Sequence, residues 1–238
     1  MTKMTASANA ARHSTGRPQF HCQAILFDLD GTLADTVPDL AVAVDRMLLD
    51  LGLRPVGEAR VRSWVGNGAT RLLQRALHDA DASAIPIEQA LSLFLKHYGY
   101  EFAVRSRLYP EVAATLRQLA ARGLRLAVCT NKPAKFVRPL LAHFGIEPLF
   151  SAIVAGDDLP RKKPDPAPLR HLADQLKVSI AACLMVGDSR NDVEAARAAG
   201  MPVAAVSYGY NYGENILDSN PDLVIDAFGD LANLIALG

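Results

Sequence analysis

Neither sign of charge is in excess in this sequence. Among its 238 residues, 25 are Lys or Arg and 25 are Asp or Glu, so the formal net charge is zero. A protein that binds nucleic acid or an anionic membrane through its overall electrostatics carries a basic excess instead. We therefore expect no nucleic acid and no membrane among the partners of this protein.

Long apolar runs are also absent. No stretch of about 18 or more uninterrupted apolar residues occurs, so no membrane-spanning helix is predicted. Half of the residues are hydrophobic, which suffices for the core of one large domain or two small ones. Nothing in the sequence decides between a monomer and a homodimer.

Cysteines are few and widely spaced. Cys22, Cys129 and Cys183 form no Cys-x-x-Cys pair, and the last two lie inside apolar runs. This pattern is typical of buried, inert thiols rather than of a disulfide framework or a metal site. A reducing compartment, the cytoplasm, is the expected location.

The first 20 residues are rich in Ser, Thr and Ala and contain no acidic residue. They lack the apolar core of a secretory signal, although transit peptides share this composition. We predict a disordered extension over residues 1–20 and exclude it from the fold.

Two carboxylates follow the first apolar run of the chain. The run from Ala24 to Phe27 has the length of a strand and leads into Asp28, Asp30 and Gly31. Residues two apart in extended backbone point to the same side, so both carboxylates reach one point beyond the strand. Such a pair is repulsive unless one group is protonated or a cation lies between them. A divalent cation such as Mg²⁺ fits this pattern, although an Asp-rich turn is the simpler alternative.

Residues 37–106 show apolar residues at helical spacing and no strand signal. The repeat is clearest at Leu40, Val44 and Met47, and it recurs over residues 72–77 and 90–98. A block of this length is too long for one crossover between two strands. We predict an inserted helical cap over residues 37–106, between core segments 21–36 and 107–238.

After residue 107, short apolar runs alternate with helical segments. Strands are expected at residues 124–129, 152–154, 182–186, 203–206 and 223–225, with helices between them at 136–143, 168–176 and 192–199. The alternation predicts an α/β fold with a Rossmann-like, mainly parallel sheet and helices on both faces. Ligands of such sheets bind beyond the carboxyl ends of the strands.

Polar residues follow four of these apolar runs. They are Asp28 and Asp30, then Thr130-Asn131-Lys132, then Asp157 and Asp158, and finally Asp188-Ser189-Arg190-Asn191-Asp192. We therefore expect four strand ends to converge on one site. Taken singly, a turn before a helix is the simpler account of Thr130 and Asn131.

Alternate prolines at positions 164, 166 and 168 follow the pair Lys162 and Lys163. They exclude helix and sheet pairing and so hold a lysine on stiff backbone. A rigidly mounted ammonium suits a fixed positive charge beside a phosphate, whereas a solvated lysine pair is the alternative. We choose Lys163, which directly precedes the first proline.

Asp188 stands at the end of an apolar run, as Asp28 does. Asp192 lies four residues later, where capping of the following helix explains it. Capping does not require Asp188, which is therefore the expected metal ligand.

Together the four segments resemble the motif set of the haloacid dehalogenase superfamily of phosphohydrolases, over about residues 23–228. The motifs are carried by Asp28-Leu29-Asp30-Gly31-Thr32, Thr130-Asn131, Lys163-Pro164 and Gly187-Asp188. The helical insertion resembles the C1 type of cap in that superfamily. This resemblance implies a Mg²⁺-dependent phosphoric monoester hydrolase whose substrate is a small phosphorylated metabolite.

The resemblance also implies how the acidic residues act. Asp28 is the nucleophile that forms an aspartyl-phosphate, and Asp30 is the general acid and base. Mg²⁺ is bound by Asp28, Asp188 and the backbone carbonyl of Asp30, and Asp192 lies behind these ligands.

The same resemblance assigns the phosphate and substrate contacts. Lys163 is a catalytic second cation that also binds the phosphate, and Thr130 and Asn131 hold phosphoryl oxygens. In the cap, Gly66 and Asn67 contact the leaving group, although a turn between two helices explains Gly66 equally well.

Residues 35–40, 65–68 and 208–213 resemble the phosphoglycolate phosphatases within the superfamily. This finer likeness implies 2-phosphoglycolate as the substrate, with glycolate and phosphate as products. The alternatives are a phosphatase or phosphomutase for another small sugar phosphate, a 2-haloacid dehalogenase and a phosphate-accepting module without turnover. Asp30 argues against the dehalogenase, because such enzymes lack this acid.

Overall fold

The computed structural model describes residues 20–237. The predicted extension lies outside them, except for its last residue. Phe20 belongs to β1 (Phe20–Cys22) and is buried, so the predicted boundary is one residue too long because this ring packs into the core.

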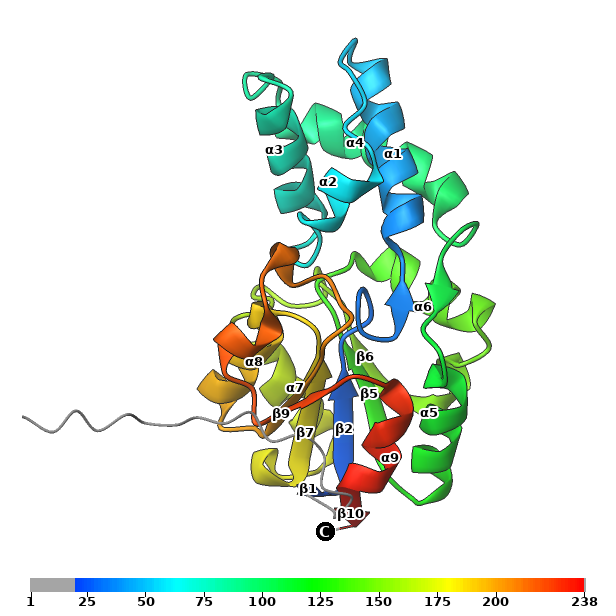
Figure 1. The fold of residues 1–238 in the computed structure, drawn as a ribbon, viewed down its shortest axis with the longest axis vertical. Helices are drawn as coiled ribbons and strands as arrows, with labels where there is room; N and C mark the ends of the chain where they lie inside the picture. The colour runs from blue at the N-terminus through cyan, green and yellow to red at the C-terminus, as the bar shows by residue number, and fades with distance from the viewer. Residues whose placement is uncertain (1–19, 238) are drawn as a thin grey trace, which may run out of the picture.

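Six parallel strands form the central sheet, in the order β6-β5-β2-β7-β8-β9 (Figure 1). They are β2 (Ala24–Phe27), β5 (Arg125–Cys129), β6 (Phe150–Val154), β7 (Cys183–Gly187), β8 (Val203–Val206) and β9 (Leu223–Ile225). The predicted α/β fold with a mainly parallel sheet is therefore confirmed.

Helices cover both faces of this sheet. One face carries α5 (Val112–Ala121), α6 (Ala134–His143) and α9 (Leu231–Leu234), and the other carries α7 (Ala167–Leu176) and α8 (Arg190–Ala199). Strand β2 supplies both layers, because Ile25 and Phe27 point into the first core and Ala24 and Leu26 into the second. A strand buried on both faces reads as a continuous apolar run, which is why it was predictable.

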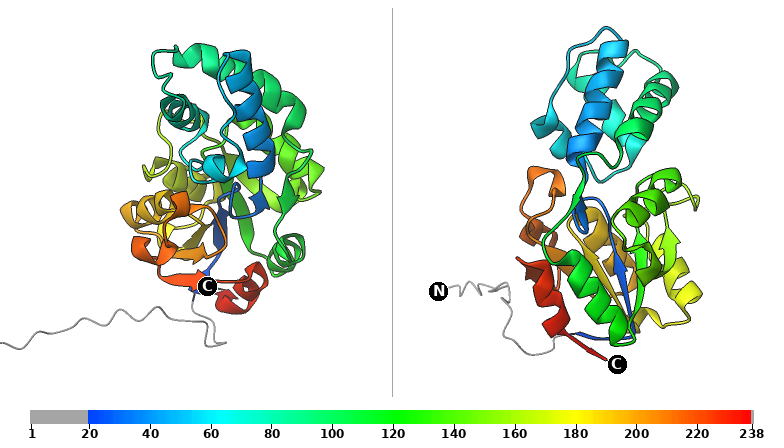
Figure 2. Two further views of the ribbon diagram at one scale, coloured as in Figure 1. Left: turned by 45° about the horizontal axis from the view of Figure 1, so that its top comes forward. Right: turned by 90° about the vertical axis from the view of Figure 1, so that its right-hand side faces the viewer.

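Four helices stand at one end of the sheet, at the top of Figures 1 and 2. They are α1 (Val37–Asp50), α2 (Glu58–Arg62), α3 (Ala69–Asp79) and α4 (Ile87–Glu101). We call residues 37–106 the cap. Their apolar faces share one hydrophobic cluster, which Phe136 of α6 and Tyr210 also join. The division of the chain into core and cap domains stays a prediction.

The two chain segments that lead into and out of the cap run side by side. They form the antiparallel pair β3 (Ala34–Asp35) and β4 (Arg107–Leu108). Inside the cap, the buried Asp39 side chain accepts hydrogen bonds from the backbone N–H groups of Arg105 and Ser106, both at 2.8 Å, and from Ser106 Oγ at 2.6 Å. One carboxylate thus ties the start of α1 to the returning segment.

Some short elements were not predicted. Strand β1 pairs in parallel with β10 (Ile235–Leu237) at the foot of the core, and five single 3-10 turns occur at Glu147–Leu149, Ile180–Ala182, Asn211–Gly213, Ile216–Ser219 and Phe228–Asp230. No helix within residues 20–237 has the length and apolar character needed to cross a membrane.

Candidate active site

Three neighbouring strands end at the site. Asp28 follows β2, Thr130 follows β5 and Asp188 follows β7, and these strands are adjacent in the sheet. All three side chains are buried. The cap helices lie over this end of the sheet (Figure 1).

Oxygens of Asp28, Asp188 and Asp192 gather within 4.8 Å of one another. Burial is the largest cause that raises the pKa of Asp28, to about 7, even though the Lys163 ammonium opposes the rise. Burial, together with the charges of Asp192 and Asp28, raises the pKa of Asp188 well above its usual range. Three carboxylates against one ammonium leave two negative charges, which a divalent cation would balance.

Asp192 is already committed to other contacts. Its Oδ1 lies 2.6 Å from Lys163 Nζ, and its Oδ2 accepts from Ser189 Oγ at 2.8 Å and from the N–H groups of Ser189 and Asp188. It thereby caps α8 and fixes the loop that carries Asp188. Asp28 and Asp188 are left as the carboxylates that could bind a metal ion.

Asp188 is held in place from two directions. Thr32 Oγ1 donates to its Oδ1 at 2.9 Å, and the N–H of Tyr210 donates to its Oδ2 at 2.8 Å. Gly31 packs against it with a φ of +88°, and a Cβ added there would lie 2.3 Å from Asp188 Oδ2. Only glycine fits at this turn.

Lys163 lies between two carboxylates, those of Asp28 and Asp192. Its Nζ is 3.1 Å from Asp28 Oδ1 as well as 2.6 Å from Asp192 Oδ1. Burial alone would lower its pKa, but Asp192 and Asp28 raise it. Lys163 therefore stays charged where it meets Asp28.

Asp30 lies at the edge of the site and faces the cap. Its Oδ1 accepts from Thr36 Oγ1 at 2.6 Å and from Lys132 Nζ at 2.9 Å. Lys132 Nζ also donates to Tyr98 OH of α4 at 2.7 Å. Asp30 is thus connected through Lys132 to the cap.

Asn131 makes contacts that differ from those expected. Its Nδ2 donates to the backbone oxygens of Gly66 and Lys163, both at 2.9 Å, while its buried Oδ1 has no partner among the described residues. Both amide hydrogens are therefore in use here, and this side chain joins the core to the cap. Its contact with a phosphoryl oxygen stays a prediction.

The cap residues Gly66 and Asn67 lie at the same junction. Gly66 O also accepts from Asn191 Nδ2 at 3.0 Å, and Asn67 Nδ2 donates to Asn191 Oδ1 at 3.3 Å. Arg75 Nη2 donates a hydrogen bond to Asn67 Oδ1 at 2.8 Å. Gly66 lines the cavity above Asp28, whereas Asn67 lines a separate open hollow.

The sequence placed Lys132 and Asn191 in the converging polar segments after β5 and β7 but indicated no role for them. It did not indicate Tyr98 or Thr36 as members of the site. Tyr98 was placed correctly on the apolar face of a helix, but nothing in that spacing shows where its hydroxyl lies.

Comparison with known proteins identifies relatives of this chain. The family model described as haloacid dehalogenase-like hydrolase matches residues 22–200. A phosphoglycolate phosphatase of Yersinia pestis is 49% identical over 215 residues, covering 90% of this chain and 93% of that protein. One from Pseudomonas putida is 50% identical over 208 residues, covering 85% and 75%.

A solved structure agrees with these relatives. The crystal structure described as a predicted phosphoglycolate phosphatase from Haemophilus somnus matches with a TM-score of 0.84 and 43% identity, covering 90% of this chain and 96% of that one. The family match covers well over half of the sequence and includes the four segments that build the site. The chain belongs to the haloacid dehalogenase-like hydrolase family.

Proposed function

We propose that this protein is a phosphoglycolate phosphatase that hydrolyses 2-phosphoglycolate to glycolate and phosphate with Mg²⁺ as its cofactor. Two relatives named for this activity are 49% and 50% identical to it over most of its length. At that similarity the same reaction is the expected one.

The arrangement of Asp28 is the observation that carries the chemistry. Its Oδ1 accepts from the N–H of Leu29 at 2.7 Å and meets Lys163 Nζ at 3.1 Å. Its Oδ2 has no hydrogen-bond partner within the described part of the chain. One oxygen is therefore held still while the other remains available for attack.

In the proposed mechanism, Asp28 Oδ2 attacks the phosphorus and the bond from phosphorus to the glycolate oxygen breaks. A carboxylate that approaches a phosphate dianion faces roughly 4 kcal/mol of repulsion per charge pair at about 4 Å and an effective dielectric near 20. Lys163 offsets part of this charge from within the site. A Mg²⁺ ion bound by Asp28, Asp188 and the backbone oxygen of Asp30 would supply further charge stabilisation.

Asp30 handles the protons. It gives a proton to the departing glycolate oxygen and later takes one from the water that attacks the phosphorus. That second attack releases phosphate and restores Asp28. In this mechanism Thr130 and Asn131, both at the end of β5, bind phosphoryl oxygens.

A cytoplasmic location and a monomeric or homodimeric state stay predictions. Cys22, Cys129 and Cys183 are free and buried, and burial raises the pKa of Cys129 to about 12. These thiols are unreactive at neutral pH, as expected for structural cysteines.

The test measures phosphate release from 2-phosphoglycolate, sugar phosphates and nucleotides, with Mg²⁺ and with EDTA. We expect the highest kcat/KM for 2-phosphoglycolate and no activity in EDTA. The Asp28→Asn variant should keep its circular dichroism spectrum and lose at least about 10⁴-fold in kcat.

Asp174→Asn is the matched control, because this exposed aspartate lies on α7 away from the site. It should retain full activity. Turnover by Asp28→Asn would show that Asp28 is not the nucleophile. A wild type with a higher kcat/KM for another phosphate ester would show that 2-phosphoglycolate is not the substrate.

A further inference from the structure

Lys132 is a buried cation that the proposed mechanism leaves without a task. Its side chain is 2% exposed. An ammonium group has three N–H donors, and Asp30 Oδ1 and Tyr98 OH account for two of them. The third has no acceptor within residues 20–237. A cation buried in this way is costly unless its donors are used.

Tyr98 offers a second donor at the same point. Its hydroxyl oxygen accepts from Lys132, so its own proton is free to be donated, and no described residue receives it. The ring stacks on Phe94 with centroids 5.4 Å apart and meets Phe136 edge-on at 4.7 Å. This packing holds the hydroxyl in one position.

Both groups line the cavity that contains the catalytic carboxylates. Asp28, Asp30 and Thr130 form its core side, and its cap side is largely apolar, with Leu40, Val65, Leu72 and Phe94. Lys132 is the one cation among the described lining residues. An anionic substituent that entered this cavity would have Lys132 as its ion-pair partner.

The position of Lys132 matches the dimensions of 2-phosphoglycolate. In this molecule one methylene separates the ester oxygen from the carboxylate. The group that protonates the ester oxygen must therefore be a close neighbour of the group that binds the carboxylate. Asp30 has the first role in the proposed mechanism, and Lys132 Nζ lies 2.9 Å from it.

We propose that Lys132 and Tyr98 bind the carboxylate of the substrate, Lys132 through an ion pair and Tyr98 through its hydroxyl. This inference rests on the proposed function and assigns its specificity to two residues. It also explains why a lysine follows Thr130 and Asn131 at the end of β5, where its head group reaches the cap.

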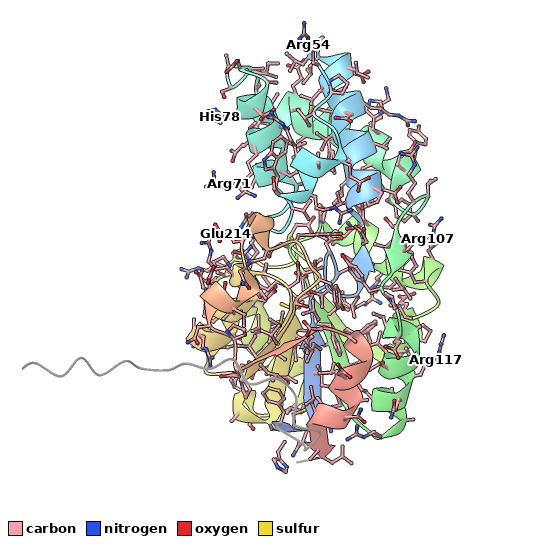
Figure 3. The ribbon with its side chains drawn as sticks, in the orientation of Figure 1. Arg54, Arg71, His78, Arg107, Arg117 and Glu214 are labelled. Carbon is pink, nitrogen blue, oxygen red and sulfur yellow. The ribbon has the colours of Figure 1, made fainter. Side chains whose placement is uncertain are left out.

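The arginines of α3 are less suited to this role. Arg71 and Arg75 line a different, open hollow with Asn67, Gln74 and His78. Figure 3 shows the Arg71 and His78 side chains pointing outward from the helix. Arg75 is bonded to the Trp64 carbonyl and to Asn67.

The test compares two esters that differ only at the proposed contact. Ethyl phosphate has the same phosphate and carbon chain as 2-phosphoglycolate but a methyl group in place of the carboxylate. We expect Tyr98→Phe to lower kcat/KM for 2-phosphoglycolate by roughly 10-fold to 100-fold, the range for a hydrogen bond to a charged group. Its kcat/KM for ethyl phosphate should fall less, so the preference for 2-phosphoglycolate over ethyl phosphate should drop by about 10-fold or more.

Lys132→Met provides the second variant. It also removes a partner of Asp30, so both esters should be hydrolysed more slowly, and 2-phosphoglycolate should lose a further 10-fold or more. The ratio of the two kcat/KM values cancels any general loss. Tyr100→Phe is the control, because Tyr100 belongs to the same helix and is 74% exposed.

The outcomes separate this inference from the proposed function. If the wild type prefers 2-phosphoglycolate and its kcat/KM ratio over ethyl phosphate is unchanged in both variants, only the assignment of Lys132 and Tyr98 is overturned. A wild type that prefers esters without a carboxylate overturns both claims. If the wild type prefers another phosphate ester with a carboxylate, and its preference for that ester over ethyl phosphate falls in Tyr98→Phe, 2-phosphoglycolate is excluded as the substrate. The role of Lys132 and Tyr98 as the carboxylate site is then supported.

Discussion

Ionisation of Asp28 is energetically unfavourable, because its side chain is buried among other carboxylates. Its pKa in the folded protein is about 7, against an ordinary value of 3.8. Between these two pH values the folded chain keeps a proton that the unfolded chain has released. The stability that this proton contributes is fully present below pH 3.8 and is lost as the pH rises through 7.

A comparison of stability with pH tests this account. In EDTA, we expect Asp28→Asn to become more stable relative to the wild type as the pH rises from 4 to 8, by at least about 1 kcal/mol. The free energy of unfolding is measured by urea denaturation at each pH. Asp174→Asn should show no such trend, and a constant difference for Asp28→Asn would contradict the account.

Residues differ in how far their sequence context revealed their position. Lys163 was predictable because the prolines after it restrict the backbone, and the structure buries it beside Asp28. The burial of Lys132 against Tyr98 was not predictable, since a lysine in a turn is usually solvated and Tyr98 is 34 positions away. Contacts that depend on the docking of a separate helix leave no local signal.

Among the elements, the pair β3 and β4 and the Asp39 contacts beside it determine how the cap is attached. The start of α1 and the segment that returns from α4 are joined by three hydrogen bonds to one buried carboxylate. Loss of that carboxylate would leave the buried N–H of Ser106 without an acceptor.

We therefore expect Asp39→Ala to lower the free energy of unfolding by about 2–4 kcal/mol. Ser106→Ala, which removes only the hydroxyl contact, should cost about 1 kcal/mol. Chemical denaturation of the three proteins measures the difference. Equal losses in the two variants would show that the backbone contacts of Asp39 contribute little.

Long elements were predictable and short ones were not. The strands and helices of the sheet appear in the sequence as apolar runs and helical repeats, with ends displaced by one or two residues. Strands β3 and β4 have two residues each, too few to show a pattern. Strand β10 pairs with β1 from the opposite end of the chain, which no local window can reveal.

At the scale of the whole molecule, the proposed catalytic groups lie between the end of the sheet and the cap helices. The cavity that contains Asp28 is lined from both sides, by Asp30 and Thr130 from the core and by Val65 and Leu72 from the cap. A substrate in this cavity therefore contacts both the sheet end and the cap helices.

A divalent cation should stabilise the entire fold, because it offsets the negative charge that the core buries. At a Mg²⁺ concentration of about 100 Kd, the gain is about 2.7 kcal/mol, which corresponds to a rise in Tm of roughly 5–10 °C for a chain of this size. Thermal unfolding with Mg²⁺ and with EDTA measures it. Asp188→Ala should abolish the rise, and a variant that keeps it would exclude Asp188 as a ligand.

One carbonyl oxygen connects the cap to the core beside the cavity. Gly66 O accepts from Asn131 on one side and from Asn191 on the other. These two amides belong to the segments that follow β5 and β7, so a single atom of the cap is anchored to the ends of two strands of the sheet. A displacement of Gly66 would break both hydrogen bonds together.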